Sequence, residues 1–217
     1  PTNIKSPFLG KEFNKDQIKE ILKKNRYSEK LTFDYLNSDE ELFKTASKFI
    51  VNEKVIGWFQ GKMEFGPRAL GNRSILADPR NPNMKEIINK KIKRRESFRP
   101  FAPSVLEEFQ SEWFESDFFN PYMSSLATVR EEKRKIIPAV THFDNTARLQ
   151  TVNKSLNLKF YGLLNYFYKL TKVPILLNTS FNENEPIVYK PEEALECILR
   201  TDMDAVFIEN FFIRKIN

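Results

Sequence analysis

The sequence predicts a mixed fold of the α/β or α+β class for a chain of 217 residues. Segments with the period of an amphipathic helix alternate loosely with short apolar segments of strand length. Hydrophobic residues make up 41% of the chain and include 20 Phe, while charged residues of both signs make up 29%, which indicates a packed core beneath a polar surface. No apolar run approaches the roughly 20 residues of a membrane span. We therefore expect a cytoplasmic protein without a membrane partner.

The first 60 residues are expected to contain two helices and two strands. Asn14 begins a helical pattern with apolar residues on one side, and Ser38 with Glu41 forms a capping box ahead of a second helix. The expected strands cover residues 31–36 and 54–60.

Residues 61–82 are expected to form a long irregular connection. Three of the six glycines fall between Gly61 and Gly71, and prolines interrupt the remainder, so the segment holds too many breakers for a regular element. Helical periodicity returns over residues 84–92. A loop that concentrates backbone freedom in this way is a place to look for a site.

The rest of the chain continues the alternation. Pro100 and Pro103 exclude a helix over residues 98–103. The expected strands cover residues 102–106, 124–129, 148–152, 173–177, 205–208 and 211–214. The expected helices cover residues 107–114, 157–170 and 191–199, and a proline opens the last of them.

The positive charge of the chain is confined to one segment. Residues 60–100 hold eleven Lys or Arg against four Asp or Glu, a local net charge of +7, whereas the whole chain carries +6. The remainder is therefore close to neutral. This distribution predicts an anionic, phosphate-bearing partner, with a solvated basic helix face as the alternative.

The chain has one cysteine, Cys197, and one histidine, His142, which excludes an internal disulfide and any metal centre built on several of either residue. The simplest interpretation gives both residues a structural role. His142, which lies beside Asp144, is also suited to hold a proton. We predict no dedicated metal site. The acidic residues available to assist a nucleotide-bound Mg²⁺ are Glu64, Asp78, Asp144 and Glu185.

The first candidate binding segment covers residues 61–74. Its glycines let main-chain N–H groups approach an anion, while Arg68 and Arg73 are suited to fork onto phosphate oxygens. The spacing does not match a Walker A loop. An ordinary surface turn is the alternative.

The second candidate segment, residues 93–103, presents several cations ahead of an extended proline-containing stretch, as a polyphosphate requires. The cations are Lys93, Arg95 and Arg99. One alternative is a basic helix end that complements the helix dipole. Another is single-stranded RNA binding, with bases stacked on Phe98 and Phe101.

Two further segments carry polar side chains on expected strands. In residues 141–152, Arg148 and Gln150 lie two apart on one expected strand and should face the same way. In residues 174–186, an apolar strand ends in small polar residues, where ligands of α/β sheets commonly bind. These are Asn178, Thr179, Ser180 and Asn182. No hydrolase elbow surrounds Ser180.

Taken together and in this order, the four segments resemble the C-terminal part of the NodU/CmcH-type O-carbamoyltransferases. The motifs that carry the resemblance are EFGPRALGNRSILADP at residues 64–79, FRPFAP at 98–103 and LNTSFN at 177–182. The resemblance implies a YrdC-like α/β domain, a twisted mixed sheet flanked by helices with a concave basic face.

In that family the domain cleaves carbamoyl phosphate and couples the carbamate to ATP, which gives carbamoyl-adenylate and pyrophosphate. Carried over, the resemblance implies ATP with Mg²⁺ and carbamoyl phosphate as ligands and no protein nucleophile. The implied catalytic residues are Arg68, Lys93, Arg99 and Ser180. The implied ATP- and carbamoyl-phosphate-binding residues are Arg73, Arg95, Arg148, Gln150, Asn178, Thr179 and Asn182.

The resemblance also implies a missing N-terminal domain that holds an iron site and recognises the acceptor alcohol. Residues 1–37 are expected to be an appendage or linker from that domain, and residues 38–217 the YrdC-like carbamoyltransferase domain. The sequence departs from the family where Asn145 and Asn184 replace glycine, although Asn tolerates left-handed backbone angles best among the other residues.

Two other functions stay open. YrdC-like folds also occur in tRNA modification, so the chain is alternatively an RNA-binding module, or a non-catalytic domain that docks through its Phe-rich surface. An RNA footprint should spread its positive charge, whereas here one segment holds all of the excess. Nucleic acid is therefore the less favoured partner.

Overall fold

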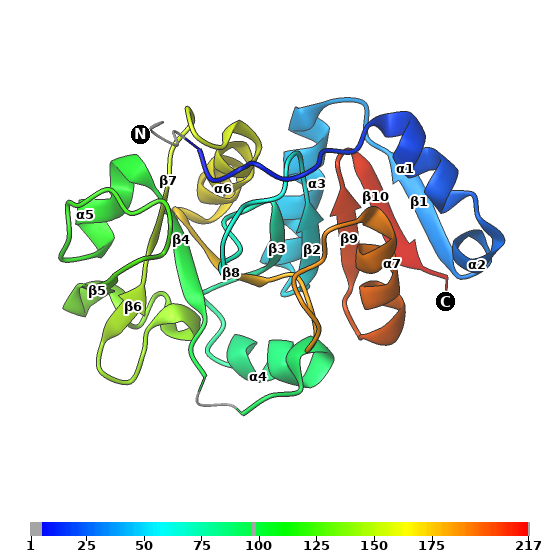
Figure 1. Cartoon of the computed structure of the whole chain (residues 1–217). Helices are drawn as coiled ribbons and strands as arrows, with labels where there is room; N and C mark the ends of the chain where they lie inside the picture. Colours follow the sequence, from blue (N-terminus) through cyan, green and yellow to red (C-terminus); the bar gives the residue numbers. More distant parts are fainter. Residues whose placement is uncertain (1–5, 97–98, 217) are drawn as a thin grey trace.

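An eight-stranded mixed sheet runs through the computed structural model, which describes residues 6–96 and 99–216 (Figure 1). The strand order is β1-β10-β9-β2-β3-β8-β4-β7, in which β2–β9 and β4–β7 pair in parallel. The strands are β1 (Leu31–Tyr35), β2 (Ile56–Phe59), β3 (Arg73–Ala77), β4 (Ala102–Leu106), β7 (Gln150–Val152), β8 (Ile175–Ser180), β9 (Ala205–Ile208) and β10 (Phe211–Lys215). The expected mixed α/β architecture is confirmed.

Helices cover both faces of this sheet. In Figure 1, α7 lies in front of β9, and α3 lies behind the sheet, where it packs against α6. Buried side chains from these layers form one continuous hydrophobic core. The α-helices are α1 (Lys15–Leu22), α2 (Asn25–Ser28), α3 (Asp39–Val51), α4 (Met84–Ile88), α5 (Gln110–Trp113), α6 (Leu158–Thr171) and α7 (Pro191–Arg200). A π-helix, Asn89–Lys93, extends α4, and 3₁₀ helices cover Glu107–Phe109, Glu131–Lys133 and Pro138–Val140.

The expected helix starts before α1 and α3 are confirmed by their caps. Asn14 Oδ1 accepts the N–H of Gln17 at 2.9 Å, and the Gln17 side chain accepts the N–H of Asn14 at 3.0 Å. Ser38 Oγ accepts the N–H of Glu41 at 3.1 Å, but the Glu41 carboxylate accepts the N–H of Asn37 at 2.8 Å and not that of Ser38, so the expected capping box is only half formed. Each bond satisfies a donor that the first helical turn leaves without a partner.

The described residues of the segment 1–37 are integrated with the rest of the fold. β1 pairs antiparallel with β10 along its whole length and forms one edge of the sheet. Ile18 and Leu22 of α1 and Tyr27 of α2 are buried in the same core as the sheet residues. The sheet and core therefore run from this segment into the remainder without a break.

A small two-stranded sheet lies beyond the β7 end of the main sheet, together with α5 (Figure 1). Its strands are β5 (Leu126–Thr128) and β6 (Thr146–Arg148), paired antiparallel. Asn145, in the turn before β6, has a φ of 65°, in the left-handed region that Asn tolerates better than most other residues with a side chain.

Two expectations about strands are wrong. Residues 61–82 are not one irregular connection, because β3 within them is fully buried between β2 and β8. The expected strand over residues 148–152 is two strands in different sheets, since β6 ends at Arg148 and β7 begins at Gln150. Arg148 and Gln150 therefore do not share one strand face. Among the described residues, no helix is long and apolar enough to cross a membrane.

Candidate functional site

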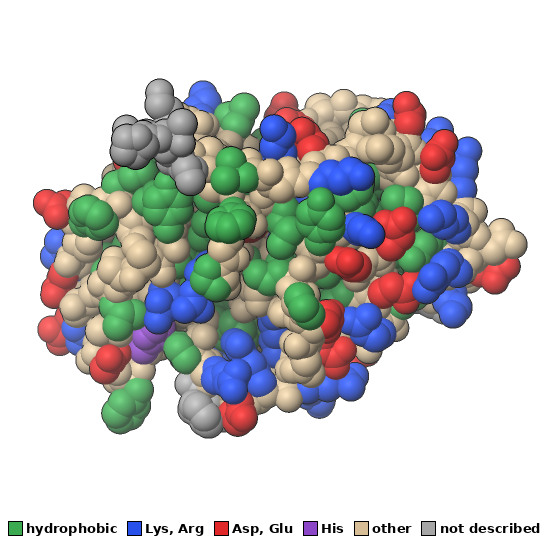
Figure 2. All heavy atoms as spheres, viewed as in Figure 1, with side chains coloured by type: hydrophobic (Ala, Val, Ile, Leu, Met, Phe, Trp, Pro, Cys, Tyr) green, Lys and Arg blue, Asp and Glu red, His purple; other side chains and the backbone are tan. Residues whose placement is uncertain are grey.

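A cleft of about 330 Å³ lies where four segments that are distant in the sequence meet. It is lined by Pro67, Arg68 and Ala69 before β3, by Arg95, Arg99, Pro100, Phe101 and Ala102 around the start of β4, by Met123, His142 and Arg148 beside the small sheet, and by Asn178, Thr179 and Ser180 of β8. Figure 2 shows basic side chains close to the single histidine and over α4. None of these lining residues is acidic.

The carboxylate of Glu64 folds the loop that carries Arg68. The Glu64 side chain is buried, and its Oε1 accepts three main-chain N–H bonds at 2.6 to 3.2 Å. The donors are Leu70, Asn72 and Arg73. Because one oxygen draws these amides together, the loop closes on itself and Arg68 lies exposed on it, at the edge of the cleft.

Arg73, expected from the sequence to bind ATP or carbamoyl phosphate, lies outside the cleft. Its buried guanidinium lies 3.5 Å from the centroid of the Phe59 ring. Nη1 and Nη2 donate to main-chain carbonyls of Lys11, Gln60, Gly61 and Asn72 at 2.7 to 3.3 Å. Burial lowers the pKa of Arg73 to about 10. The geometry gives this side chain a role in holding the loop to β2.

Lys93 lies beneath Ser180 and not on the cleft surface. Its Nζ is 2.6 to 3.3 Å from four oxygens, the main-chain and side-chain oxygens of Ser180 and Asn182. The side chain is 2% exposed, and burial lowers the pKa of Lys93 to about 7. Lys93 therefore fixes the end of β8 by hydrogen bonds.

Gln150 and Asn178 belong to a buried hydrogen-bond network behind the cleft. Gln150 Nε2 donates to the Leu70 carbonyl at 2.8 Å, and Gln150 Oε1 accepts from Ser104 Oγ at 2.6 Å and from Asn178 Nδ2 at 3.0 Å. Asn178 Nδ2 also contacts Ser104 Oγ at 3.0 Å and the Ala69 carbonyl at 3.3 Å. Asn178 lines the cleft, whereas Gln150 supports it from behind.

Four arginines give the cleft its charge, namely Arg68, Arg95, Arg99 and Arg148. Arg95 lies over the Phe101 ring at 4.6 Å, and burial lowers its pKa. Arg99 is exposed and pairs with Glu96 at 3.0 Å. Among the described residues, no carboxylate pairs with the other three. The charge is thus largely uncompensated and favours an anionic ligand.

His142, which the sequence indicated as structural or as suited to hold a proton beside Asp144, lines the cleft. Its Nδ1 contacts Thr146 Oγ1 at 3.2 Å, while Nε2 is buried and has no hydrogen-bond partner among the described residues. Burial lowers the pKa of His142. The sequence signals were that it is the single histidine, that it lies beside Asp144 and that it falls in the segment that carries Arg148.

The structure gathers most of the residues predicted for the site. Those that line the cleft are Arg68, Arg95, Arg99, Arg148, Asn178, Thr179 and Ser180. Those that contact lining residues from behind are Lys93, Gln150 and Asn182. Only Arg73 is separate from the cleft. Phe98 lies outside the described residues, while Met123 lines the cleft without any sequence signal.

The acidic residues considered for Mg²⁺ do not converge. Glu64 folds its loop, Asp78 accepts two forked bonds from Arg80, and Glu185 pairs with Arg200 at 2.6 Å. Across the part of the chain that the structure describes, no three His, Cys, Asp or Glu side chains group as metal ligands would.

Comparison with known proteins gives a family and a fold. Residues 47–215 match the family model described as the carbamoyltransferase C-terminus. The chain is 47% identical to nodulation protein NolO of Bradyrhizobium diazoefficiens over 96% of this chain and 38% of that protein. It is 44% identical to the 3'-hydroxymethylcephem-O-carbamoyltransferase of Amycolatopsis lactamdurans over 60% of this chain and 25% of that protein.

Among solved structures, full-length HypF in its phosphate- and nucleotide-bound form superimposes with a TM-score of 0.52 at 17% identity, over 81% of this chain and 24% of that chain. This likeness shows the fold. The chain spans only 38% and 25% of the length of the two curated relatives.

Proposed function

Since the chain belongs to the carbamoyltransferase C-terminus family, we propose that its cleft binds ATP and carbamoyl phosphate and forms carbamoyl-adenylate. The observation that carries the proposal is the meeting of four arginines and the hydroxyl-bearing end of β8 in one cleft without an acidic lining residue. The volume of about 330 Å³ falls at the lower end of the roughly 300–1,000 Å³ typical of small-molecule sites.

The proposed chemistry suits this charge distribution. Hydrolysis of carbamoyl phosphate releases carbamate and phosphate. An oxygen of carbamate then attacks the α-phosphorus of ATP, the bond to the β-phosphate breaks, and pyrophosphate leaves. Two anions must approach each other, so fixed cations that stabilise the charge of the transition state supply the catalysis.

The position of each residue in the cleft indicates its proposed role in the reaction. Arg68 and Arg99 lie on the exposed edge, where they would bind the phosphate chain, and Ser180 would hold the carbamoyl or phosphate oxygens from the end of β8. Lys93 would act from beneath by fixing Ser180. Mg²⁺ would arrive with the nucleotide, because no acidic residue lines the cleft.

The proposed formation of carbamoyl-adenylate requires no nucleophile from the protein. Burial raises the pKa of the Cys197 thiol to about 12, and this residue is not among those that line the cleft. Ser180 Oγ donates its proton to Asn182 Oδ1 at 2.7 Å, and Lys93 Nζ, 3.3 Å from Ser180 Oγ, also contacts three other oxygens of Ser180 and Asn182. Transfer of the carbamoyl group to an acceptor alcohol, and any iron site, would belong to the rest of a longer polypeptide.

Pyrophosphate release tests the proposal. The chain is incubated with ATP, Mg²⁺ and carbamoyl phosphate, and ATP binding is measured separately by calorimetry. Arg99→Ala should lower pyrophosphate release by about 100-fold, the typical effect of removing one transition-state donor. Because Arg99 is exposed, the unfolding free energy of the Arg99→Ala variant should differ from that of the wild-type chain by less than about 1 kcal/mol.

Arg214→Ala is the matched control. Arg214 is also an exposed arginine in an ion pair, with Asp34 at 3.0 Å, but it lies on β10 and does not line the cleft. It should leave pyrophosphate release unchanged. Absence of both ATP binding and pyrophosphate release in the wild-type chain would overturn the proposal. Binding of a tRNA with a steep salt dependence would then favour an RNA-binding module.

A further inference from the structure

The chain changes sheets between two residues of the cleft region. Arg148, which lines the cleft, is the last residue of β6 in the small sheet, and Gln150, which supports the cleft, is the first residue of β7 in the main sheet. Only Leu149, which is 1% exposed, lies between them. The position of Leu149 therefore sets where the backbone delivers Arg148 to the cleft.

A buried asparagine, Asn120, holds this crossing point. The residue is 3% exposed, and its Nδ2 donates to the Leu149 carbonyl at 3.0 Å. Its main chain also pairs with β7, because the Asn120 carbonyl accepts the N–H of Thr151 at 2.9 Å and the Asn120 N–H donates to Thr151 Oγ1 at 3.1 Å. Three hydrogen bonds from one residue thus fix the backbone where it passes from one sheet to the other.

The same amide holds a turn that contacts Arg148. Asn120 Oδ1 accepts the N–H of Ser124 at 3.0 Å, and Nδ2 donates to Ser125 Oγ at 2.8 Å. Met123, just before these serines, has a φ of 52°, a strained left-handed conformation for a residue with a side chain. Its carbonyl accepts Arg148 Nη1 at 3.5 Å. The Asn120 bonds therefore hold the strained turn that supplies the partner of Arg148.

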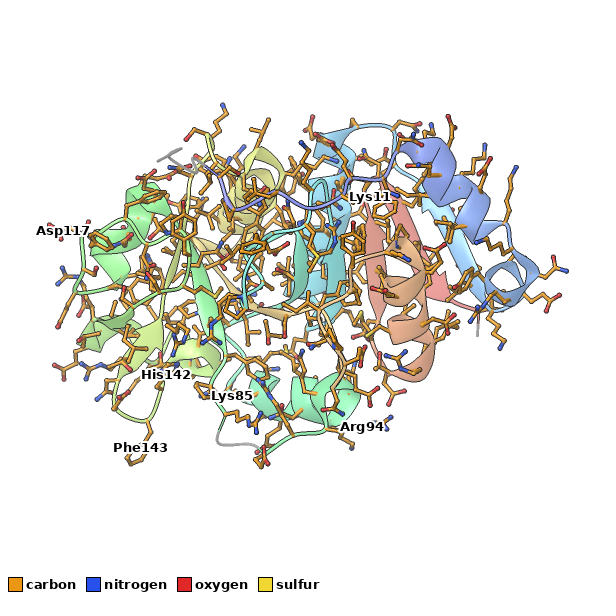
Figure 3. All side chains as sticks on the ribbon, viewed as in Figure 1. Lys11, Lys85, Arg94, Asp117, His142 and Phe143 are labelled. Atoms are coloured by element: carbon orange, nitrogen blue, oxygen red, sulfur yellow. The ribbon has the colours of Figure 1, made fainter. Side chains whose placement is uncertain are left out.

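The Arg148 guanidinium has few other contacts to position it. Within residues 6–96 and 99–216, the long bond to the Met123 carbonyl is its only hydrogen bond. Its reach into the cleft therefore depends on its own backbone and on the Met123 turn, and Asn120 holds both. These residues belong to the small-sheet lobe (residues 110–149), which in Figure 3 reaches from Asp117 at its outer edge to His142 near the cleft.

We infer that Asn120 is a positioning residue of the cleft and acts through Arg148 on the binding of a di- or triphosphate. The inference rests on the proposed function and deepens it. Asn120 is not among the residues that line the cleft, so its effect on a ligand must pass through residues that are. A guanidinium binds phosphate oxygens by directional bonds, and a small displacement of such a group lowers its contribution strongly.

A double-mutant cycle tests the inference. Binding of inorganic pyrophosphate and of ATP to the full chain is measured by calorimetry, at a temperature where each variant is folded. Arg148→Ala should weaken pyrophosphate binding by about tenfold, as expected on removing a charge-assisted hydrogen bond. Asn120→Ala should weaken it several-fold. Because both act through one guanidinium, the double variant should bind as Arg148→Ala does. Losses that multiply in the double variant overturn the inference.

Gln110→Ala is the matched control for a general loosening of the small-sheet lobe. Gln110 is another buried amide, 4% exposed, and its Nε2 donates to the carbonyls of Ser116 and Phe118 at 3.0 and 2.9 Å. It also contacts Thr151, but it bonds neither Leu149 nor the Met123 turn. The variant should lower the free energy of unfolding and keep the pyrophosphate affinity within about twofold. A loss equal to that of Asn120→Ala overturns the inference.

A milder variant keeps the test decisive if Asn120→Ala does not fold. Ser124→Ala with Ser125→Ala changes two exposed residues and removes their side-chain bonds to Asn120. This variant should weaken pyrophosphate binding by about two- to threefold in the wild-type background and not in the Arg148→Ala background. The same loss in both backgrounds overturns the inference.

The outcomes distinguish the inference from the function on which it rests. Unchanged pyrophosphate affinity in Asn120→Ala or in Arg148→Ala overturns the positioning role and leaves the proposed function to the other three arginines of the cleft. A wild-type chain that binds neither pyrophosphate nor ATP overturns the proposed function itself.

Discussion

Replacing Lys93 by Met should remove a pH dependence of folding that the wild-type chain shows between pH 7 and 9. Lys93 is 2% exposed, and no carboxylate among the described residues forms an ion pair with it. Burial lowers its pKa from 10.5 to about 7, and the neighbouring charge of Arg95 acts in the same direction. The folded state thus releases a proton that the unfolded chain retains.

The magnitude follows from linkage between protonation and folding. Above about pH 7 the folded chain loses the Lys93 proton, whereas the unfolded chain keeps it up to about pH 10.5. The unfolded state binds more protons in this window, so the free energy of unfolding rises with pH. At 1.36 kcal/mol per pKa unit, the rise between pH 7 and 9 is about 2 kcal/mol. Below pH 7 both states are protonated and the contribution is absent.

Urea unfolding at pH 7, 8 and 9 measures this difference. Lys93→Met should lack the rise of about 2 kcal/mol. Lys91→Met, which removes a neighbouring lysine of the π-helix that pairs with Asp204 at 2.7 Å, should retain it. The window ends at pH 9 because burial raises the pKa of Cys197 to about 12, which opposes the trend at higher pH. An equal slope in Lys93→Met and wild type would refute the reasoning.

Two further predictions concern the loop before β3. Gly71→Ala should lower the free energy of unfolding by at least about 3 kcal/mol, because its φ is 104° and an added Cβ would collide with the Phe160 ring. Gly66→Ala, at a φ of 119° with open space around the added Cβ, should cost only about 1–2 kcal/mol, and equal losses in urea unfolding would contradict the role of Phe160. Arg73→Met should lower the unfolding free energy by about 3 kcal/mol, since it leaves buried carbonyls without donors; an unchanged thermal midpoint would show that Arg73 does not hold the loop.

Local signals predicted much of the fold. The periodicity of α1 and α3, with their Asn14 and Ser38 caps, depends on residues within a few positions of each other and was legible in the sequence. The same holds for β4, which follows a proline-rich stretch. β3 was missed because its five residues follow a run of glycines and prolines that favours a loop. Its pairing with β2 and β8 is a tertiary effect that overrides this local preference.

The motif resemblance predicted the family, which the family model and relatives confirm. The motifs also indicated which segments meet at the cleft, but they did not separate side chains that face it from side chains that support it. Arg68 and Arg73 belong to one motif, yet Arg68 is exposed and Arg73 is buried. The Glu64 carboxylate accounts for this difference in exposure. It accepts N–H groups of the loop between the two arginines and so folds that loop back on itself.

The basic segment shows why charge counted along a sequence overstates charge at a site. Residues 60–100 carry eleven Lys or Arg, but only Arg68, Arg95 and Arg99 line the cleft. Arg73 and Lys93 are buried against oxygens, and Arg80 and Lys91 pair with carboxylates; the fourth cleft arginine, Arg148, lies outside the segment. A cation acts on a ligand only where it reaches the cleft, so the anion affinity of this cleft should depend on its four arginines, of which only Arg99 shares its charge with a carboxylate among the described residues, and not on the net charge of the segment.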